Sequence, residues 1–539
     1  MPAYNLADSS MIEVVGRGTW LDKVAKRILE REQKLGRSLH LINVESGLGA
    51  SGIPHVGSIG DAVRAYGVKL ALQDMDYKSR LVAYSDDLDG LRKIPDGLPE
   101  WLSKHIAKPV SMIPDPFDCH ESYGSHMSSM LLDGLDKLAI DYTFQSGAEA
   151  YKSGLLNKQI DIILQNADKI GSKIADALGQ TKFEKVLPYY PICAGCGRIY
   201  VAQALQYIPE EKRVIYKCDG AEIRKQWLQG CGHSGETDIT KGLGKLSWKG
   251  EFAARWSALD IRFEAYGKDI ADSVHINDWI SDEVLKFPHP SHVKYELFLD
   301  KSGKKISKSL GNVFTPQTWF MYGTPQSLML LMFKRIKGTR NLSVEDIPNY
   351  MDELDTLEDL YFGKTKEENE QKRIRLKGLY EYVHKLSSPQ KPSLHVPYRL
   401  LAQLVAVAPP DDLVGYVEKK LASYGMLKQI DDSLKIKIAL ARKWTEDFSK
   451  LERKRVILSE VDKQCISELA QYLAEEADQK ALQSEIFEIA KRNGIEPSQF
   501  FKTLYRVLLG SERGPRLGPY IIDIGRDRIR GVLDEQLSK

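Results

Sequence analysis

The fold is decided by the apolar stretch Leu39-His-Leu-Ile-Asn-Val-Glu45 and by the glycine-rich loop Ser46-Gly-Leu-Gly-Ala-Ser-Gly52 that follows it. An apolar, β-branched stretch of this length is typical of a buried parallel strand. A helical pattern then runs from about residue 58 to residue 72, and Ser79-Arg-Leu-Val-Ala-Tyr84 is a second buried strand. Strand, helix and strand at this spacing form a βαβ unit, which requires a right-handed crossover. We therefore predict an α/β domain with a Rossmann-type parallel sheet.

The glycine loop permits two interpretations. Gly47, Gly49 and Gly52 match the G-x-G-x-x-G pattern of a dinucleotide-binding loop, which would indicate an NAD-dependent oxidoreductase. That pattern also requires a helix opening at the third glycine and an acidic residue ~20 positions later. Pro54 disfavours a helix at the residue before it. The acidic pair Asp86-Asp87 begins 34 residues after Gly52, so the dinucleotide interpretation fits poorly.

The segment Pro54-His55-Val56-Gly57-Ser58 closes this loop and places a histidine where the predicted helix begins. Free backbone N–H groups and the helix dipole favour phosphates at such a point. We therefore expect His55 to donate to phosphate oxygens rather than to abstract a proton. Gly57 would let a nucleotide approach the backbone closely. For a histidine considered alone, a structural role is the alternative.

A lysine-rich loop lies about 250 residues further on, at Lys301-Ser-Gly-Lys-Lys-Ile-Ser-Lys-Ser-Leu-Gly311. Four lysines within eight residues usually indicate a solvated surface turn. Attack of a carboxylate on the α-phosphate of ATP, however, builds negative charge that positioned ammonium groups and a metal ion stabilise. Lys305 and Lys308 are the candidates for this role. The flanking glycines suit a loop that closes over ATP and reopens.

Four of the six cysteines fall within 39 residues, in a stretch with little periodicity of its own. Cys193 and Cys196 form a C-x-x-C pair, Cys218 and Cys231 follow, and His233 stands just beyond. A tetrahedral structural Zn²⁺ site explains this spacing, because a metal ion orders a segment too small to have its own core. The fourth ligand is either Cys231 or His233, and buried free thiols are the alternative.

Acidic and aromatic residues supply candidates for an amino-acid pocket. Asp86 and Asp87 follow the second predicted strand, at the sheet edge where ligands bind in open α/β folds. A carboxylate there could hold the α-ammonium group of an amino acid or, if the substrate is lysine, its ε-ammonium group. A helix cap or a turn is the alternative for either aspartate. Trp256 and Tyr295 are candidates for packing on the substrate's side chain.

The histidine-containing and lysine-rich segments resemble the H-I-G-H and K-M-S-K-S signatures of the class I aminoacyl-tRNA synthetases. A closer resemblance, to the archaeal-type class I lysyl-tRNA synthetases, extends over nearly the whole chain. It is carried by the cysteine cluster and by the segments 84–95, 113–120, 347–355 and 514–518. Residues 263–269 likewise resemble a segment that lines the nucleotide site in this family.

This resemblance implies aminoacylation of tRNA(Lys) with L-lysine through a lysyl-adenylate, with ATP and Mg²⁺, in a reaction that needs bound tRNA. His55, Lys305 and Lys308 would be the catalytic residues. The implied ATP contacts are Gly47, Gly49, His55, Gly57, Ser58, Asp269, Lys305, Ser307 and Lys308. The implied substrate contacts are Gly47, Asp86, Asp87, Trp256 and Tyr295. The implied ligands of structural zinc are Cys193, Cys196, Cys218 and Cys231.

The chain departs from the family pattern at three places. Gly49-Ala50 stands where the family loop usually has Thr-Pro, Ser58 stands at the second polar position of H-I-G-N, and Ile270 replaces the histidine of Gly-Lys-Asp-His. These departures concern the expected contacts to the amino acid and the ribose. They do not concern the phosphate chemistry.

The expected architecture is a Rossmann catalytic domain with a zinc-bearing insertion, followed by an all-α anticodon-binding region. Residues 12–35 are predicted to form an amphipathic helix, and residues 119–185 are predicted to be mostly helical. The expected domains are a helical extension (1–38), the first catalytic part (39–185), the zinc insertion (186–245), the second catalytic part (246–315), a connecting region (316–360) and the anticodon-binding domain (361–539). Basic clusters at 334–340, 373–377 and 442–455 are candidates for tRNA contacts, although interleaved acidic residues also fit a solvated helix face.

The composition is that of a globular chain, with 42% hydrophobic and 28% charged residues. The net charge of +2 gives no argument for nucleic-acid binding, which must rest on local patches. The sequence shows no signal-like N-terminus and no apolar stretch near the ~18–20 residues that a membrane span needs. We expect a cytoplasmic monomer in which Cys119 and Cys465 are ordinary thiols. A synthetase for another amino acid, such as glutamate, an oxidoreductase and a non-catalytic tRNA-binding relative are the alternatives.

Overall fold

The structure is a computed structural model that describes residues 14–300, 314–427, 429–448, 456–510, 512 and 514–538. The predicted lysine-rich loop, with Lys305, Ser307 and Lys308, lies outside these residues. The chain forms two compact units. The first comprises Met1–Gln317, Met329–Leu342 and Glu367–Ser387, and the second comprises Thr318–Leu328, Ser343–Lys366 and Ser388–Lys539.

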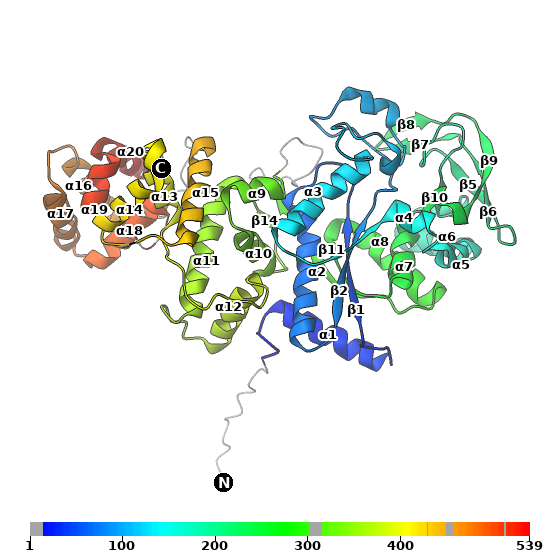
Figure 1. Ribbon diagram of the computed structural model, residues 1–539, viewed down its shortest axis with the longest axis horizontal. Coiled ribbons are helices and arrows are strands. Elements are labelled where there is room, and N and C mark those ends of the chain that lie inside the picture. Colours follow the sequence, from blue (N-terminus) through cyan, green and yellow to red (C-terminus); the bar gives the residue numbers. More distant parts are fainter. Residues whose placement is uncertain are drawn as a thin grey trace, which may run out of the picture. The chain divides into compact units, whose positions relative to one another are not determined.

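The first unit is built around a five-stranded parallel sheet in the order β12-β11-β1-β2-β3 (Figure 1). Its strands are β1 (Ile42–Leu48), β2 (Ser79–Ser85), β3 (Thr143–Ser146), β11 (Ile261–Gly267) and β12 (Ser291–Tyr295). The predicted Rossmann-type sheet is confirmed. From β1 the chain continues to β2 and β3 on one side, and β11 and β12 lie on the other. The topological switch point therefore falls between β1 and β11, and ligands of such sheets bind beyond the carboxyl ends of the strands there.

The main helices of this sheet domain are α1 (Trp20–Lys34), α2 (Val56–Asp74), α3 (Tyr123–Lys137), α7 (Trp248–Ala258) and α8 (Ala271–Trp279). The predicted crossover helix corresponds to α2, which runs between β1 and β2 and packs against both. Two predicted boundaries were wrong. β1 begins three residues later than predicted, and α1 begins at Trp20 rather than near residue 12. Thr19 caps α1, and Gly16 and Gly18 adopt positive φ angles that are incompatible with a helix.

An insertion separates β3 from α7. It begins with the helices α4 (Gly147–Lys152), α5 (Asn157–Gln165) and α6 (Ala167–Leu178). Short antiparallel strands follow, namely β4 (Tyr189–Pro191), β5 (Gln203–Ile208), β6 (Arg213–Lys217), β7 (Gly220–Ile223), β8 (Gln226–Gln229), β9 (Ser234–Asp238) and β10 (Gly244–Leu246). Buried Lys245 on β10 lies 2.5 Å from Asp89 and 2.7 Å from Glu251, so charge pairs join the insertion to the sheet domain.

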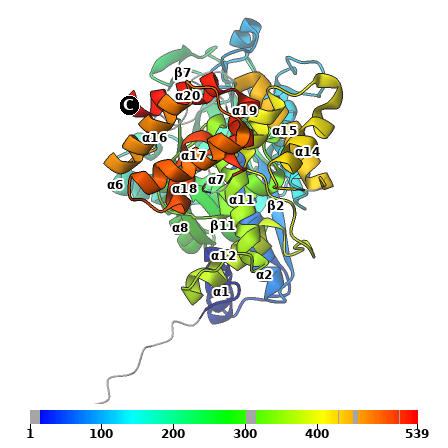
Figure 2. The same ribbon diagram turned by 90° about the vertical axis from the view of Figure 1, so that its left-hand side faces the viewer.

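The first unit also contains β13 (Phe298–Leu299), β14 (Arg340–Asn341) and α12 (Glu370–Val383), while α9 (Pro316–Tyr322) and α10 (Pro325–Phe333) have residues in both units. The other helices of the second unit are α11 (Ile347–Tyr361), α13 (Tyr398–Val405), α14 (Leu413–Ser423), α15 (Asp432–Phe448), α16 (Glu460–Tyr472), α17 (Gln479–Arg492), α18 (Pro497–Leu509), α19 (Leu517–Ile524) and α20 (Arg526–Ser538). Figure 2 shows α16, α17, α18 and α20 gathered into one bundle. The described part of this unit contains no strand, as predicted. Of the helices described, none combines the length and the apolar character needed to cross a bilayer.

Candidate functional site

A cavity of about 220 Å³ opens at the carboxyl ends of β1, β2, β11 and β12, beside the N-terminus of α2. This is the switch point of the sheet, where the topology predicts a ligand. Eight residues that the sequence analysis assigned to ATP or to the substrate line this cavity, namely Gly47, Gly49, His55, Gly57, Ser58, Asp86, Asp269 and Tyr295. The fold thus brings predicted residues from distant parts of the chain to one site.

His55 is the N-cap of α2, as predicted. Its Nδ1 accepts a hydrogen bond from the backbone N–H of Ser58 at 3.2 Å. Because Nδ1 is an acceptor, the neutral imidazole carries its proton on Nε2 and can donate from that atom. A Cβ atom at Gly57 would lie 2.8 Å from the imidazole ring, so a larger residue there would displace His55. The Val56 N–H donates to the Phe314 carbonyl at 2.7 Å and the Ser58 N–H donates to His55, so this end of α2 attracts an anion through the helix dipole and the Nε2–H of His55.

Arg255 on α7 is buried beside the cavity among three carboxylates. Its Nη1 donates to Asp86 at 2.9 Å and its Nη2 donates to Glu264 at 3.4 Å. Its Nε lies 2.9 Å from Glu45 as an ion pair without the alignment of a hydrogen bond. Burial, partly offset by Arg255, raises the pKa of Glu45 to about 8 and that of Asp86 to about 7. Carboxylates outnumber the guanidinium group, so this wall of the cavity favours a cationic ligand.

Asp87 does not line this cavity, although Asp86 does. Its carboxylate accepts from the Ser146 hydroxyl at 2.5 Å and from the backbone N–H of Ala148 at 2.7 Å. These contacts fix the start of α4 and use both carboxylate oxygens. Ser146 is the N-cap of α4, and Asp87 supports this helix start from the end of β2, which is close to the structural alternative in the sequence analysis.

Trp256 is fully buried and likewise does not line the cavity. Its indole N–H donates to Glu264, which places the ring behind the wall rather than on its surface. Two other aromatic residues of α7, Trp248 and Phe252, line the cavity instead. The structure does not bring Trp256 to the position expected for contact with a substrate.

The four cysteines of the insertion converge on one point. The Sγ atoms of Cys193, Cys196, Cys218 and Cys231 all lie within 4.8 Å of one another. His233 contributes its backbone carbonyl to a hydrogen bond with the N–H of Cys218. The cluster is consistent with a zinc site, and it favours Cys231 over the imidazole as the fourth ligand.

Comparison with known proteins decides the family. Residues 18–385 match the family described as "tRNA synthetases class I (K)". The chain is 51% identical over 527 residues to the lysine–tRNA ligase of Cenarchaeum symbiosum (strain A), covering 98% of this chain and 100% of that protein. The chain belongs to the class I lysyl-tRNA synthetases. It is also 30% identical over 530 residues to the lysine–tRNA ligase of Rickettsia bellii (strain OSU 85-389), covering 96% and 98% of the two chains. This synthetase is a lysine–tRNA ligase, and the oxidoreductase interpretation of its glycine loop does not apply.

The synthetase has a second cluster of metal-ligand residue types that the sequence analysis missed. Ligand atoms of Asp115, Cys119, His120 and His126 lie within 4.8 Å of one another. Buried Asp115 accepts backbone N–H bonds from Cys119 at 3.0 Å and His120 at 2.9 Å, which shapes the loop around its carboxylate. Cys119 is a free, exposed cysteine, and the expectation that it is an ordinary thiol stays a prediction beside this candidate metal site. The sequence did contain a signal for this cluster. Asp115, Cys119 and His120 have the spacing D-x-x-x-C-H, and His126 follows on the next helix.

Two further residues of this synthetase site, Asp61 and Arg64, were also missed. Both belong to α2 and line the cavity. The sequence contained a signal for Asp61. It lies four residues after Gly57, and residues at this spacing share one face of a helix.

Proposed function

We propose that the cavity binds lysine and ATP side by side and that lysyl-adenylate forms there. An oxygen of the lysine carboxylate attacks the α-phosphorus, the α–β phosphoanhydride bond breaks, and pyrophosphate leaves. The terminal ribose hydroxyl of tRNA(Lys) then attacks the lysyl carbonyl carbon, and AMP leaves. The observation that supports this proposal is the convergence of the N-terminus of α2 and the acidic wall around Arg255 on one cavity.

The proposed roles follow from the position of each group. The Nε2–H of His55 binds phosphate oxygens, the dipole of α2 favours their negative charge, and Gly57 keeps the backbone accessible. Asp86 holds the α-ammonium group of lysine beside the carboxyl end of β1. Lys305 and Lys308, from outside the described residues, stabilise the departing pyrophosphate together with Mg²⁺.

Replacing His55 with alanine is expected to lower kcat/KM for lysine charging about 100-fold, because a donor to the developing phosphate charge is lost. Charging of total tRNA with each of the twenty amino acids, in the presence of Mg-ATP, gives the measurement. The wild-type chain is expected to charge lysine alone. His275→Ala is the matched control, since His275 is 67% exposed on α8 and outside the cavity. Equal activity of the two variants, or charging with another amino acid, would contradict the proposal.

We propose that Cys193, Cys196, Cys218 and Cys231 bind structural zinc, and that Asp115, Cys119, His120 and His126 bind a second ion of the same kind. The donor types and the convergence of both sets support this assignment. Elemental analysis of the purified chain is expected to give two zinc ions per chain. Cys218→Ser and His126→Ala should each remove one, whereas Cys465→Ala, in the core of the second unit, should remove none. If either cluster variant retains both ions, the proposal that its cluster binds a metal ion is contradicted.

We infer that the helical second unit contains the anticodon-binding surface and that the synthetase acts as a monomer in the cytoplasm. The absence of strands in the described part of this unit agrees with the helical domain that the resemblance implies. The two compact units share the region 316–360 between them, so the boundaries of a separate connecting domain stay a prediction.

A further inference from the structure

Asp61 lies on α2 one helical turn after Gly57, and its side chain is 25% exposed where it lines the cavity. Residues four apart on a helix share a face, so Asp61 lies on the side that carries the proposed phosphate site. One turn corresponds to about 5.4 Å along the helix axis. The Asp61 carboxylate therefore lies about one helical turn along α2 from the proposed phosphate site.

Within the part of the chain that the structure describes, the polar contacts of the Asp61 carboxylate involve one of its two oxygens. The Tyr295 hydroxyl donates to Oδ1. Arg64 Nη1 lies 3.9 Å from the same oxygen, beyond hydrogen-bond distance. The Arg64 guanidinium instead stacks on the Tyr295 ring, with 4.2 Å between its central carbon and the ring centroid. This arrangement leaves Oδ2 available to a donor that enters the cavity.

Three other carboxylates that line the cavity already contact a cation. Arg255 hydrogen-bonds to Asp86 and Glu264, and Glu296 forms an ion pair with a neighbouring lysine. Asp61 differs from these three, because the nearest cation among the described residues, Arg64, lies 3.9 Å away and beyond hydrogen-bond distance. Burial raises the pKa of Asp61 to about 7, and Tyr295 and Arg64 only partly oppose this effect. A positively charged ligand group would supply the interaction that the protein itself does not complete.

Lysine carries such a group at the end of a four-carbon side chain. If Asp86 holds the α-ammonium group, the side chain extends across the cavity toward α2, and its apolar part passes Tyr295. A glutamate side chain would instead place a second carboxylate opposite Asp61, and an uncharged side chain would leave Asp61 without a partner. Both cases are unfavourable in a buried site.

We propose that Asp61 determines the specificity for lysine by accepting the ε-ammonium group, with Tyr295 holding its carboxylate in place. This inference rests on the proposed function of the cavity and names the substrate group that α2 recognises. It differs from the expectation that Asp86 or Asp87 binds this group. Arg255 neutralises part of the charge of Asp86, and Asp87 lies outside the cavity.

The test compares lysine with 6-hydroxynorleucine, a neutral analogue in which a hydroxyl replaces the ε-ammonium group. Asp61→Asn is expected to lower kcat/KM for lysine about 100-fold, because a buried charge pair loses one partner. Relative to the wild type, the KM for ATP should change by no more than about twofold, because ATP does not contact Asp61 in this proposal. The inhibition constant of 6-hydroxynorleucine should change by no more than about threefold, because this analogue has no ε-ammonium group. Asp61→Glu should restore part of the lost activity. Asp96→Asn, at a 55% exposed carboxylate, is the matched control.

Equal losses for lysine and 6-hydroxynorleucine, or an equal rise in the KM for ATP, would overturn the assignment. If lysine recognition survives Asp61→Asn while His55→Ala still lowers kcat/KM for charging about 100-fold, the proposed function stands and this inference fails. If Asp61→Asn does not fold, the wild-type enzyme provides a second test. Its preference for lysine over 6-hydroxynorleucine should fall as the pH drops below about 7, where Asp61 takes up a proton. A constant preference from pH 6 to pH 8 would count against Asp61.

Discussion

Replacing Arg255 with methionine is expected to abolish lysine charging and to lower the free energy of unfolding by about 3–5 kcal/mol. Methionine fills a similar volume but leaves Glu45, Asp86 and Glu264 buried without the guanidinium group that they share. The pKa of Glu45 and of Asp86, already raised by burial, would rise further. Asp86 would then be protonated at neutral pH and would no longer hold the α-ammonium group of lysine.

The loss of unfolding free energy in Arg255→Met should depend on pH in a direction that the pKa shifts predict. A carboxyl group whose folded pKa lies above its unfolded value destabilises the fold increasingly as the pH rises. The difference in the free energy of unfolding between the wild type and Arg255→Met should therefore be larger at pH 8 than at pH 6. Urea unfolding at both pH values, together with lysine charging, measures it. Arg213→Met, at a 45% exposed position, should change stability by less than about 0.5 kcal/mol. A deficit that is constant with pH would contradict the argument.

The sheet domain was predictable because its signals are local. The stretch at 39–45 is rich in apolar and β-branched residues, and Pro54 disfavours a helix at the residue before it. These two features place β1 and the start of α2 within a few residues of their true bounds. The position of His55 at the cap followed directly. The cysteine cluster was predictable for the same reason, because its four cysteines fall within 39 residues and two of them form a C-x-x-C pair.

The substrate side of the site was less predictable, because it depends on which face a residue occupies. Asp86 and Asp87 are neighbours at the end of one strand, yet only Asp86 lines the cavity. Arg255 and Trp256 are neighbours on α7, and the arginine lines the cavity whereas the tryptophan does not. Successive residues of a strand or a helix point in different directions, and composition does not say which direction faces the ligand. The packing of α7 and of the insertion determines which of these side chains face the cavity.

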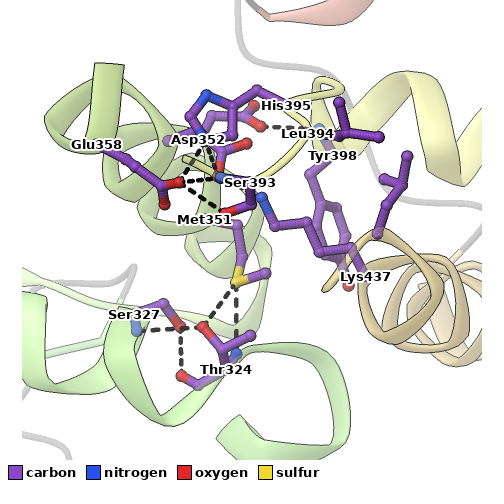
Figure 3. A network of polar contacts seen from close by, with 12 residues as sticks. Thr324, Ser327, Met351, Asp352, Glu358, Ser393, Leu394, His395, Tyr398 and Lys437 are labelled. Carbon is purple, nitrogen blue, oxygen red and sulfur yellow. Dashed lines mark hydrogen bonds and ion pairs between the residues drawn. The ribbon is translucent and has the colours of Figure 1, made fainter. Parts of the chain in front are cut away.

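His395, in the second unit, is expected to stabilise the fold through a buried charge network that the sequence analysis did not predict. Figure 3 shows His395 beside Glu358 and Ser393, with Lys437 and Asp352 nearby. The imidazole Nδ1 donates to Asp359 at 3.0 Å, and Nε2 lies 3.5 Å from Glu358 as an ion pair. The Ser393 hydroxyl also donates to Glu358, at 2.7 Å. The loop around His395 is thus attached to α11 by charge-assisted contacts.

The pKa shifts in this network determine the pH range in which His395 stabilises the fold. Burial lowers the pKa of His395, but the contact with Glu358 and the charge of Asp355 outweigh it, so the pKa is raised. Burial raises the pKa of Glu358, but the contacts with His395 and Ser393 outweigh it and lower the pKa to about 2. Lys437 on α15, which pairs with Asp355, is the other cation facing the histidine. The stabilisation by His395 is complete below its unfolded pKa of about 6.5 and is lost as the pH rises through the folded value.

Replacing His395 with asparagine should therefore cost about 3 kcal/mol at pH 6 and clearly less at pH 9. Hydrogen–deuterium exchange of the backbone N–H groups of Ser393 and Leu394 measures the effect locally, because Ser393 donates to Glu358 and Leu394, beside His395, donates to Asp431. Protection at pH 6 should fall about 100-fold. Glu358→Gln should reduce protection similarly, and the double variant should lose less than the sum, since the two groups act as a pair. Additive losses, or a loss that grows from pH 6 to pH 9, would show that the imidazolium does not hold this loop.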